Sequence, residues 1–253
     1  MTEQIKSHPK SFEITKWFGP QTANVILPDD GLNAMISMTD NIIKDKKSLS
    51  HGQNLAGVID KELKIYKSDM NASGVDQLLE SCVKSYVVHC AKQHGMFQDN
   101  YVIESNLNSA WVVSQYANEY NPIHNHTGCE ISGVIYLKVP DVKGRRNLQS
   151  KKGKQDSDGD IAFVYCTASQ RNHDIFEKGI VQMTPVPGLM LMFPSYLGHT
   201  VYPFVGEGER RCIAFNASYR IVEPNDSGNS KIIAGNLTGL KNHYFYFDEK
   251  PNE

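Results

Sequence analysis

The sequence predicts an α+β fold in which N-terminal helices cover one face of a double-sheet jelly roll. Two amphipathic helical patterns lie in the first third of the chain, whereas the hydrophobic period changes to two from about residue 100. The strand-like segments that follow are short, and loops containing Pro, Gly, Asn or Asp separate most of them. Many short strands at this spacing are typical of a barrel or a jelly roll.

Two helices are expected before the strands. Apolar residues recur near the helical period in Leu32–Lys44, and the pattern in Ser73–Gln93 is stronger. Asp76 and Glu80 lie in the early turns of the second helix, where acidic groups interact favourably with the helix dipole. Its apolar stripe contains Val75, Leu78, Leu79, Cys82, Val83, Tyr86, Val87 and Cys90. Such a stripe usually faces a core, so we expect this helix to buttress a sheet.

Six strands are expected in the rest of the chain. The points where these strands begin and end separate three regions of the chain. The strands are Tyr101–Glu104, Ala110–Tyr116, Ile131–Val139, Asp160–Val164, Leu189–Phe193 and Arg210–Tyr219. The run Pro185-Val186-Pro187-Gly188 predicts a tight turn that leads directly into the fifth. We therefore expect a helical and mixed buttress at 1–99, the strand-rich core at 100–222 and a C-terminal extension at 223–253. The aromatic run Tyr244-Phe245-Tyr246-Phe247 should pack the extension against the core.

Composition and charge argue against several classes of protein. A net charge of −2 gives no reason to expect a nucleic-acid partner, and 40% hydrophobic with 21% charged residues is ordinary for a soluble globular protein. The basic run Lys143–Lys154 is interrupted by polar residues and followed by Asp156, Asp158 and Asp160. We interpret it as a solvated loop rather than a phosphate-binding patch.

The cellular location expected from the sequence is the cytoplasm. No apolar stretch approaches the ~18 residues of a membrane span, and the polar N-terminus lacks the apolar region of a signal peptide. The five cysteines form no C-x-x-C pair, so neither a disulfide framework nor a zinc ribbon is indicated. A reducing compartment fits this pattern.

The most informative segment is His124-Asn125-His126, directly before an expected strand. Two histidines two residues apart at the start of a strand share one face, and two imidazoles on one face can bind one metal. His199 is a candidate third ligand, and together they predict a mononuclear metal site with open positions, which we interpret as an iron oxygenase site. Two alternatives stay open: loop histidines without a metal, and Glu130 as a carboxylate ligand.

The last predicted strand begins with two arginines, Arg210 and Arg211. Alternation places Arg210, Cys212 and Ala214 on one face and Arg211, Ile213 and Phe215 on the other. Arg210 could point into a barrel. It could also pair with Glu207 or Glu209 at the surface, and Arg211 would be the inward arginine if the strand began one residue differently.

Four segments, in this order, resemble the 2-oxoglutarate- and Fe(II)-dependent oxygenases. They are Tyr116–His126, Ser132–Leu137, Pro187–His199 and Arg210–Asn216. The branch that they resemble is the prolyl-hydroxylase-like one, and within it a group common in phages and marine bacteria. The resemblance covers roughly residues 110–218. It implies that the jelly roll is a double-stranded β-helix.

The resemblance also implies a role for each candidate residue. His124 and His199 match the family's metal-binding histidines, and His126 stands where most members have aspartate, which gives three histidine ligands for Fe(II). Arg210 matches the arginine that grips the distal carboxylate of 2-oxoglutarate, for which a planar guanidinium is suited. Tyr136 matches a tyrosine that often binds the same carboxylate; it could also be plain core. Tyr116 and Cys212 complete the expected 2-oxoglutarate site, and relatives often have serine in place of Cys212.

The activity implied is hydroxylation of a protein or peptide side chain, with 2-oxoglutarate and O2 consumed and succinate and CO2 released. The loops Lys143–Asp158 and Ala168–Lys178 could form the substrate lip. The expected location is then the cytoplasm, or the host cytoplasm for a phage protein, with neither nucleic acid nor membrane as a partner. Two alternatives remain: a metal-binding jelly roll without turnover, and a three-histidine thiol dioxygenase that needs no 2-oxoglutarate.

Overall fold

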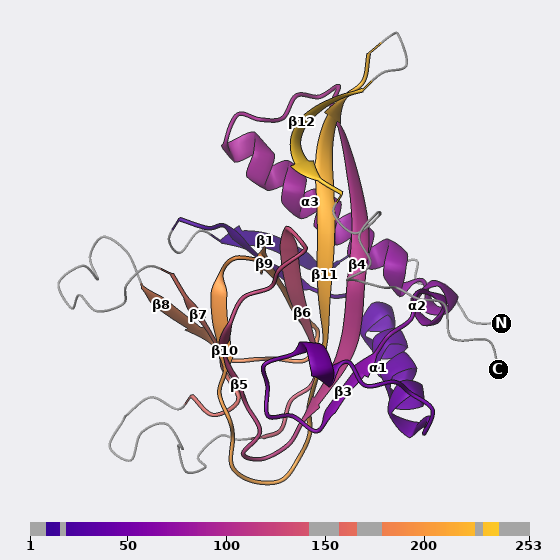
Figure 1. The fold of residues 1–253 in the computed structure, drawn as a ribbon, viewed down its shortest axis with the longest axis vertical. Helices are drawn as coiled ribbons and strands as arrows, with labels where there is room; N and C mark the ends of the chain where they lie inside the picture. The colour runs from indigo at the N-terminus through magenta and orange to yellow at the C-terminus, as the bar shows by residue number, and fades with distance from the viewer. Residues whose placement is uncertain (1–8, 16–18, 142–156, 166–178, 226–229, 238–253) are drawn as a thin grey trace.

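Two antiparallel sheets form the centre of the molecule, with helices on one side (Figure 1). The computed structural model describes residues 9–15, 19–141, 157–165, 179–225 and 230–237. The expected α+β class with a double-stranded β-helix core is confirmed, although the two sheets do not close into a barrel.

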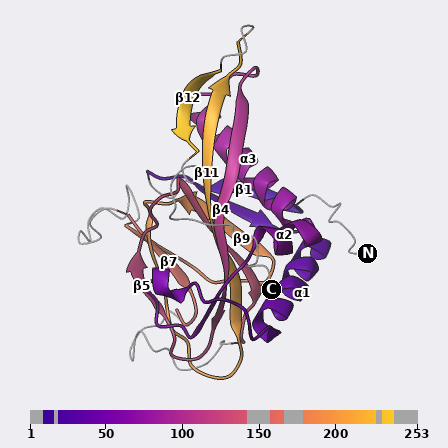
Figure 2. The same cartoon turned by 45° about the vertical axis from the view of Figure 1, so that its right-hand side comes forward.

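The large sheet has eight strands, in the order β1-β2-β9-β6-β11-β4-β3, with β12 paired to β11. Their bounds are β1 Ser11–Thr15, β2 Thr22–Ile26, β3 Lys61–Lys64, β4 Val102–Gln115, β6 Ile131–Lys138, β9 Leu189–Pro194, β11 Arg210–Glu223 and β12 Lys231–Asn236. The long strands β4 and β11 pair along almost their whole length. With β12 they reach well past the small sheet, beside helix α3 (Figures 1 and 2).

The small sheet has four strands in the order β5-β10-β7-β8. They are β5 Asn121–His124, β7 Ile161–Val164, β8 Ile180–Met183 and β10 Gly198–Val201. Their apolar side chains pack against the inner face of the large sheet, where Trp111, Val134 and Tyr136 are buried.

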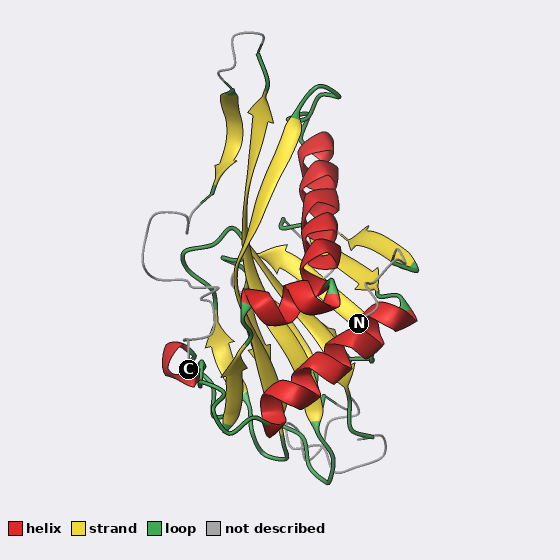
Figure 3. Cartoon of the chain, turned by 90° about the vertical axis from the view of Figure 1, so that its right-hand side faces the viewer, coloured by secondary structure: helices red, strands yellow, loops and turns green. Residues whose placement is uncertain are grey.

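Helices α1 Asp29–Lys44, α2 Lys67–Ser73 and α3 Val75–Gln93 cover the outer face of the large sheet (Figure 3). Gly74, between α2 and α3, has a φ of 70°, a left-handed conformation that glycine adopts without steric cost. The predicted apolar stripe of α3 is buried, apart from the partly buried Cys90. The helices therefore buttress the sheet as expected, and none in the described ranges is long and apolar enough to cross a membrane.

The strand alternation predicted for β11 is confirmed. Cys212 packs in the core between the sheets, whereas Ile213 and Phe215 pack in the core beneath the helices. Each side of the large sheet thus has its own apolar core. This explains why β6 and β9 are buried along nearly their whole length rather than alternating between buried and exposed residues, since both of their faces are covered.

The segment 50–60, which includes the short helix η1 Gly52–Asn54, joins the large sheet to the small one on one side. Its beginning forms a bridge between Ser50 and Leu63, and Val58 donates its N–H to Tyr120 O, just before β5. Figure 1 shows η1 between β5 and β3.

Some sequence predictions differ from the structure, and others fall outside its described ranges. The two strands expected at Tyr101–Glu104 and Ala110–Tyr116 are parts of the single strand β4. Nearly all of both predicted lip loops, the basic run among them, and Tyr244–Phe247 lie outside the described residues. The division into regions at residues 99 and 222 stays a prediction.

Candidate active site

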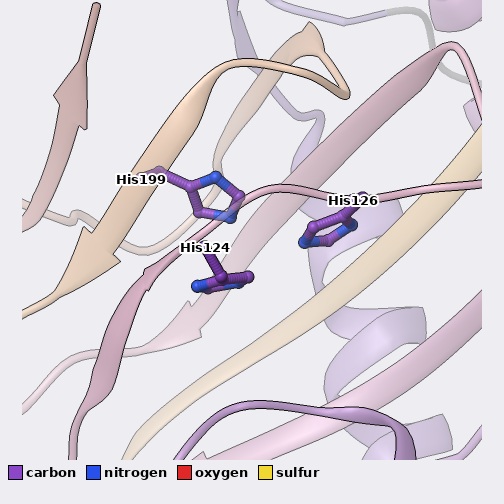
Figure 4. Close-up of side chains that lie close together, drawn as sticks. All are labelled: His124, His126 and His199. Atoms are coloured by element: carbon purple, nitrogen blue, oxygen red, sulfur yellow. The ribbon is translucent and has the colours of Figure 1, made fainter.

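The three predicted metal-binding histidines converge between the two sheets. Their candidate ligand atoms all lie within 4.8 Å of one another, and they are the only such His, Cys, Asp or Glu group in the described ranges. Figure 4 shows the rings of His124, His126 and His199 around a common space. His124 and His199 are cross-strand partners in β5 and β10, with ring centroids 4.2 Å apart.

One detail of the prediction is wrong: the H-x-H motif does not open a strand. His124 is the last residue of β5, His126 lies in the loop that follows, and β6 begins only at Ile131. The loop is held by hydrogen bonds from His126 N to Ser195 O and from Ser195 N to Glu130 O. The loop's anchoring to the end of β9, rather than strand alternation, brings the second imidazole to the first.

Each histidine donates its Nδ1 proton to an oxygen, which leaves Nε2 free to bind a metal. The acceptors are Pro122 O for His124 at 2.8 Å, Asn216 Oδ1 for His126 at 2.6 Å and Leu197 O for His199 at 3.0 Å. Because a carbonyl oxygen can only accept, these contacts place the ring proton on Nδ1. Such contacts orient metal-ligating histidines and raise their basicity as ligands.

Burial keeps two of these imidazoles neutral. It lowers the pKa of His126 to about 4 and that of His199 well below its usual value, and the neighbouring histidines act in the same direction. A neutral imidazole keeps its lone pair available near pH 7, which metal binding requires. Three imidazole nitrogen donors with fixed tautomers fit a divalent transition metal.

Arg210 lies inside the molecule, almost fully buried, with part of its guanidinium unpaired. Nε donates to Gly159 O at 3.0 Å and Nη1 to Gln115 Oε1 at 3.2 Å, whereas Nη2 has no hydrogen-bond partner among the described residues. The guanidinium carbon lies 5.0 Å from the centroid of the Tyr136 ring.

Tyr136 has a second unpaired donor next to this guanidinium. Its hydroxyl is buried without a hydrogen-bond partner in the described part of the chain, and burial raises its pKa, so it remains a protonated donor. Two buried donors without an acceptor, one of them on a cation, fit a carboxylate. The donor set at Arg210 and Tyr136 therefore fits the distal end of 2-oxoglutarate.

Arg211 points to the opposite side of the sheet, so it is not the inward arginine. Its guanidinium is bidentate to Glu209, at 2.7 and 2.8 Å, and also donates to Asp40 of α1. Glu209 is thus committed to Arg211 rather than to Arg210, and the surface pairing considered for Arg210 with Glu209 is wrong.

Of the other candidate residues, Cys212 lines the cavity, whereas Tyr116 and Glu130 do not. Cys212 is buried in the cavity wall, with its Sγ 3.8 Å from Arg210 Nη1. Tyr116 is 42% exposed, the ammonium of Lys61 lies over its ring, and it does not line the cavity. Glu130 lines a separate cavity beside α3 and is not in the histidine group.

A cavity of about 550 Å³, open solvent included, connects the histidines with Arg210. Sequence reasoning assigned no role to two polar residues near it. Asn216, which orients His126, could have been found because it shares the alternating face of Arg210 and Cys212 on β11. Glu62 carried no such signal, since it lies in the region expected to act only as a buttress. The cavity is lined by Leu55, Ala56, Glu62, Trp111, Val113, Asn121, His124, His126, Gly133, Val134, Ile161, Phe193, His199, Val201, Arg210, Cys212 and Ala214.

Comparison with known proteins gives a family match and a fold match. Residues 109–216 match the family model described as "Putative 2OG-Fe(II) oxygenase". The solved structures that are similar include the non-heme α-ketoglutarate-dependent epimerase SnoN from nogalamycin biosynthesis, at 11% identity and a TM-score of 0.51, covering 92% of this chain and 93% of that one. No curated protein matches the chain.

Two further similar structures are prolyl hydroxylases. One, from Trichoplax adhaerens in complex with a hypoxia inducible factor peptide fragment, has 17% identity, a TM-score of 0.48 and coverage of 81% of this chain and 82% of that one. The other, a Pseudomonas putida prolyl-4-hydroxylase, has 14% identity, a TM-score of 0.46 and coverage of 81% and 91%. At such identities a structural likeness concerns the fold alone, and here it rests on SnoN. Residues 109–216 thus match the 2OG-Fe(II) oxygenase family in sequence, within a chain that has the fold of such an oxygenase.

Proposed function

We propose that this protein is an Fe(II)- and 2-oxoglutarate-dependent dioxygenase that hydroxylates a protein or peptide side chain. One observation carries the proposal: a single cavity is lined by three histidines and by Arg210, whose unpaired donor lies beside the unpaired hydroxyl of Tyr136. A metal site alone would explain the histidines. It would not explain a buried cation and a buried hydroxyl that both lack an acceptor.

In the proposed enzyme, His124, His126 and His199 hold the iron through Nε2, and Asn216 keeps His126 in its tautomer. Arg210 Nη2 and the Tyr136 hydroxyl donate to the distal carboxylate of 2-oxoglutarate, with Cys212 beside them. Bound together, Fe(II), 2-oxoglutarate and O2 supply the oxidising power for C–H hydroxylation and yield succinate and CO2. Apolar side chains around the cavity keep water from the reaction.

The hydroxylase activity and the protein or peptide substrate rest on the resemblance to the prolyl-hydroxylase-like branch. Four segments carry that resemblance, and they span β4 to β11, the part of the chain that contains every proposed iron and 2-oxoglutarate contact. Any Fe(II)- and 2-oxoglutarate-dependent reaction needs the metal site and a residue such as Arg210 that binds the cosubstrate. These two features therefore do not distinguish one substrate from another.

The test is an anaerobic titration of 2-oxoglutarate into the Fe(II)-loaded protein, monitored by the visible metal-to-ligand charge-transfer band. We expect the band in the wild type and its loss in Arg210→Ala, with Fe(II) affinity nearly unchanged because Arg210 contacts none of the three histidines. Arg211→Lys is the matched control: it alters the neighbouring arginine on the outer face and should keep the band.

Iron binding without a band in either protein would contradict the proposal. That outcome would favour the three-histidine thiol dioxygenase, for which O2 consumption with small thiols is the direct assay, or a metal-binding jelly roll without turnover. A band without succinate formation on exposure to air would also contradict it.

A further inference from the structure

A carboxyl group that the proposed chemistry does not use lies at the wall of the same cavity. Glu62 belongs to β3, the edge strand of the large sheet, and is 2% exposed. Cross-strand pairing places it in one row with Val113, Cys212 and Tyr136 on β4, β11 and β6. Glu62, Val113 and Cys212 line the cavity, and Tyr136 packs with Val113 and Cys212 in the core between the sheets.

The fold does not satisfy this carboxyl group. Oε1 of Glu62 has no hydrogen-bond partner among the described residues, and no ion pair to it is found there. Burial raises the pKa of Glu62 to about 7, with a smaller contribution from Glu119. A buried acceptor without a donor lowers stability, so the fold does not benefit from this carboxyl group. Its presence is better explained by a role in binding.

Glu119 provides the contrast within the same region. Its carboxylate accepts the backbone N–H of Tyr116 at 2.6 Å and that of Asp60 at 3.2 Å. It thereby ties the 50–60 segment to the loop before β5. Both carboxylate oxygens of Glu119 thus accept a backbone N–H, whereas Oε1 of Glu62, a residue that lines the cavity, has no donor in the described ranges.

Neither the metal nor 2-oxoglutarate accounts for Glu62. It is absent from the group of candidate metal ligands, and it lies two strands away from β11, which carries Arg210. A carboxylate would repel an anionic cosubstrate. What it can bind from the cavity is a hydrogen-bond donor. Leu55 and Ala56 of the 50–60 segment form the adjoining wall, which gives the donor an apolar surround.

We propose that Glu62 is a specificity residue whose carboxylate accepts a hydrogen bond from an N–H group of the molecule that the enzyme oxidises. The inference rests on the proposed function and deepens it. The substrate group that it recognises is an N–H donor, either a neutral amide or a cationic ammonium. A buried carboxylate excludes substrates that place a carboxylate or an aprotic group at this position.

The first arm of the test measures thermal unfolding of the metal-free protein at pH 8. We expect Glu62→Gln and Glu62→Leu to unfold at a higher temperature than the wild type, because both remove an unsatisfied buried carboxylate. Glu119→Gln, the matched control, should unfold at a lower temperature because an amide cannot accept both backbone N–H groups that the Glu119 carboxylate binds. Destabilisation by both substitutions at Glu62 would assign it a structural role and overturn the proposal.

The second arm uses small probes on the Zn(II)-loaded protein at pH 8, with binding followed by saturation-transfer NMR. N-methylacetamide is compared with N,N-dimethylacetamide, and methylammonium with tetramethylammonium, so that each pair differs in its N–H donors. We expect one pair to show a preference of about tenfold for the donor, which is retained in Glu119→Gln and lost in Glu62→Leu. The amide and the ammonium pair distinguish a neutral from a cationic substrate group. Equal binding within both pairs would overturn the proposal.

The third arm separates this inference from the proposed function. Glu62→Gln should keep the charge-transfer band and bind 2-oxoglutarate within about threefold of the wild type. Loss of the band only in Glu62→Gln would assign Glu62 to the cosubstrate site and overturn the inference. Absence of the band from the wild type would instead overturn the proposed function, while the unfolding and probe arms would still decide whether Glu62 binds an N–H donor.

Discussion

At the scale of single residues, two features define the site: the hydrogen bonds that its side chains make, and the donor and ligand atoms that have no partner among the described residues. The three histidines have their Nδ1 protons occupied and their Nε2 atoms free, whereas Arg210 and Tyr136 each retain an unused donor. The sequence indicated these five residues through the H-x-H motif and through the resemblance of four ordered segments to the 2-oxoglutarate- and Fe(II)-dependent oxygenases. It could not identify free donors, because these depend on contacts between segments far apart in the chain.

Replacing Asn216 with alanine should weaken metal binding. The substitution removes the acceptor for His126 Nδ1, so the ring can rotate or change tautomer, and we expect affinity to fall about 10- to 100-fold. Competition against a chelator, with Co(II) absorption as the signal, measures the change. Ser109→Ala, which removes only a 3.3 Å contact from the Asn216 amide, is the control. Equal affinity in wild type and Asn216→Ala would show that the contact does not orient the ligand.

At the scale of elements, several apolar strands were predictable, whereas the two short strands that carry His124 and His199 were not. β6, β9 and β11 were found from their patterns, whereas β5 and β10, which carry His124 and His199, are four residues each. β7 is equally short but was found as a run of apolar residues, whereas β5 and β10 contain proline, glycine or histidine and form no such run. The placement of His126 was missed for a related reason, since it depends on a backbone contact with Ser195 rather than on a local pattern.

Gly133 of β6 tests how tightly the large sheet is packed. A Cβ at this position would lie 2.3 Å from a ring atom of Phe215, the cross-strand neighbour on β11. Gly133→Ala should therefore lower the free energy of unfolding by about 1–3 kcal/mol, the usual cost of overpacking. Urea denaturation measures it. The double variant Gly133→Ala/Phe215→Leu should recover part of the loss, and failure to recover any would place the strain elsewhere.

At the scale of the whole molecule, one sheet separates two cores, with the helices on one side and the site on the other. This layering was predictable, because the change of period near residue 100 and the stripe of α3 both indicate it. The sequence did not indicate that residues before 100 also complete the site. β3 supplies Glu62, and the 50–60 segment supplies Leu55 and Ala56, through pairings that no local pattern reveals.

Burial of the histidines should make the metal-free protein sensitive to mild acid. The folded pKa of His126 is about 4, below an unfolded value near 6.5, so the unfolded chain takes up the proton first as the pH falls. Stability from this group is complete above pH 6.5 and is lost towards pH 4, by about 2 kcal/mol between pH 7 and pH 5. Urea denaturation at both values checks this. His126→Gln should lose less over the same range; an equal loss would contradict the assignment.

The alternation of β11 also determines which changes in length the chain can tolerate. From one strand face, Arg210 lines the cavity and Asn216 holds His126, whereas Arg211 lies on the reverse face with its carboxylate partners. Inserting one residue between Arg210 and Asn216 would reverse the direction of every side chain on one side of the insertion. Either Arg210 or Asn216 would then point away from the site. An insertion in the 202–209 connection would leave the alternation intact. During divergence we therefore expect insertions and deletions to accumulate before Arg210 and to be eliminated between Arg210 and Asn216.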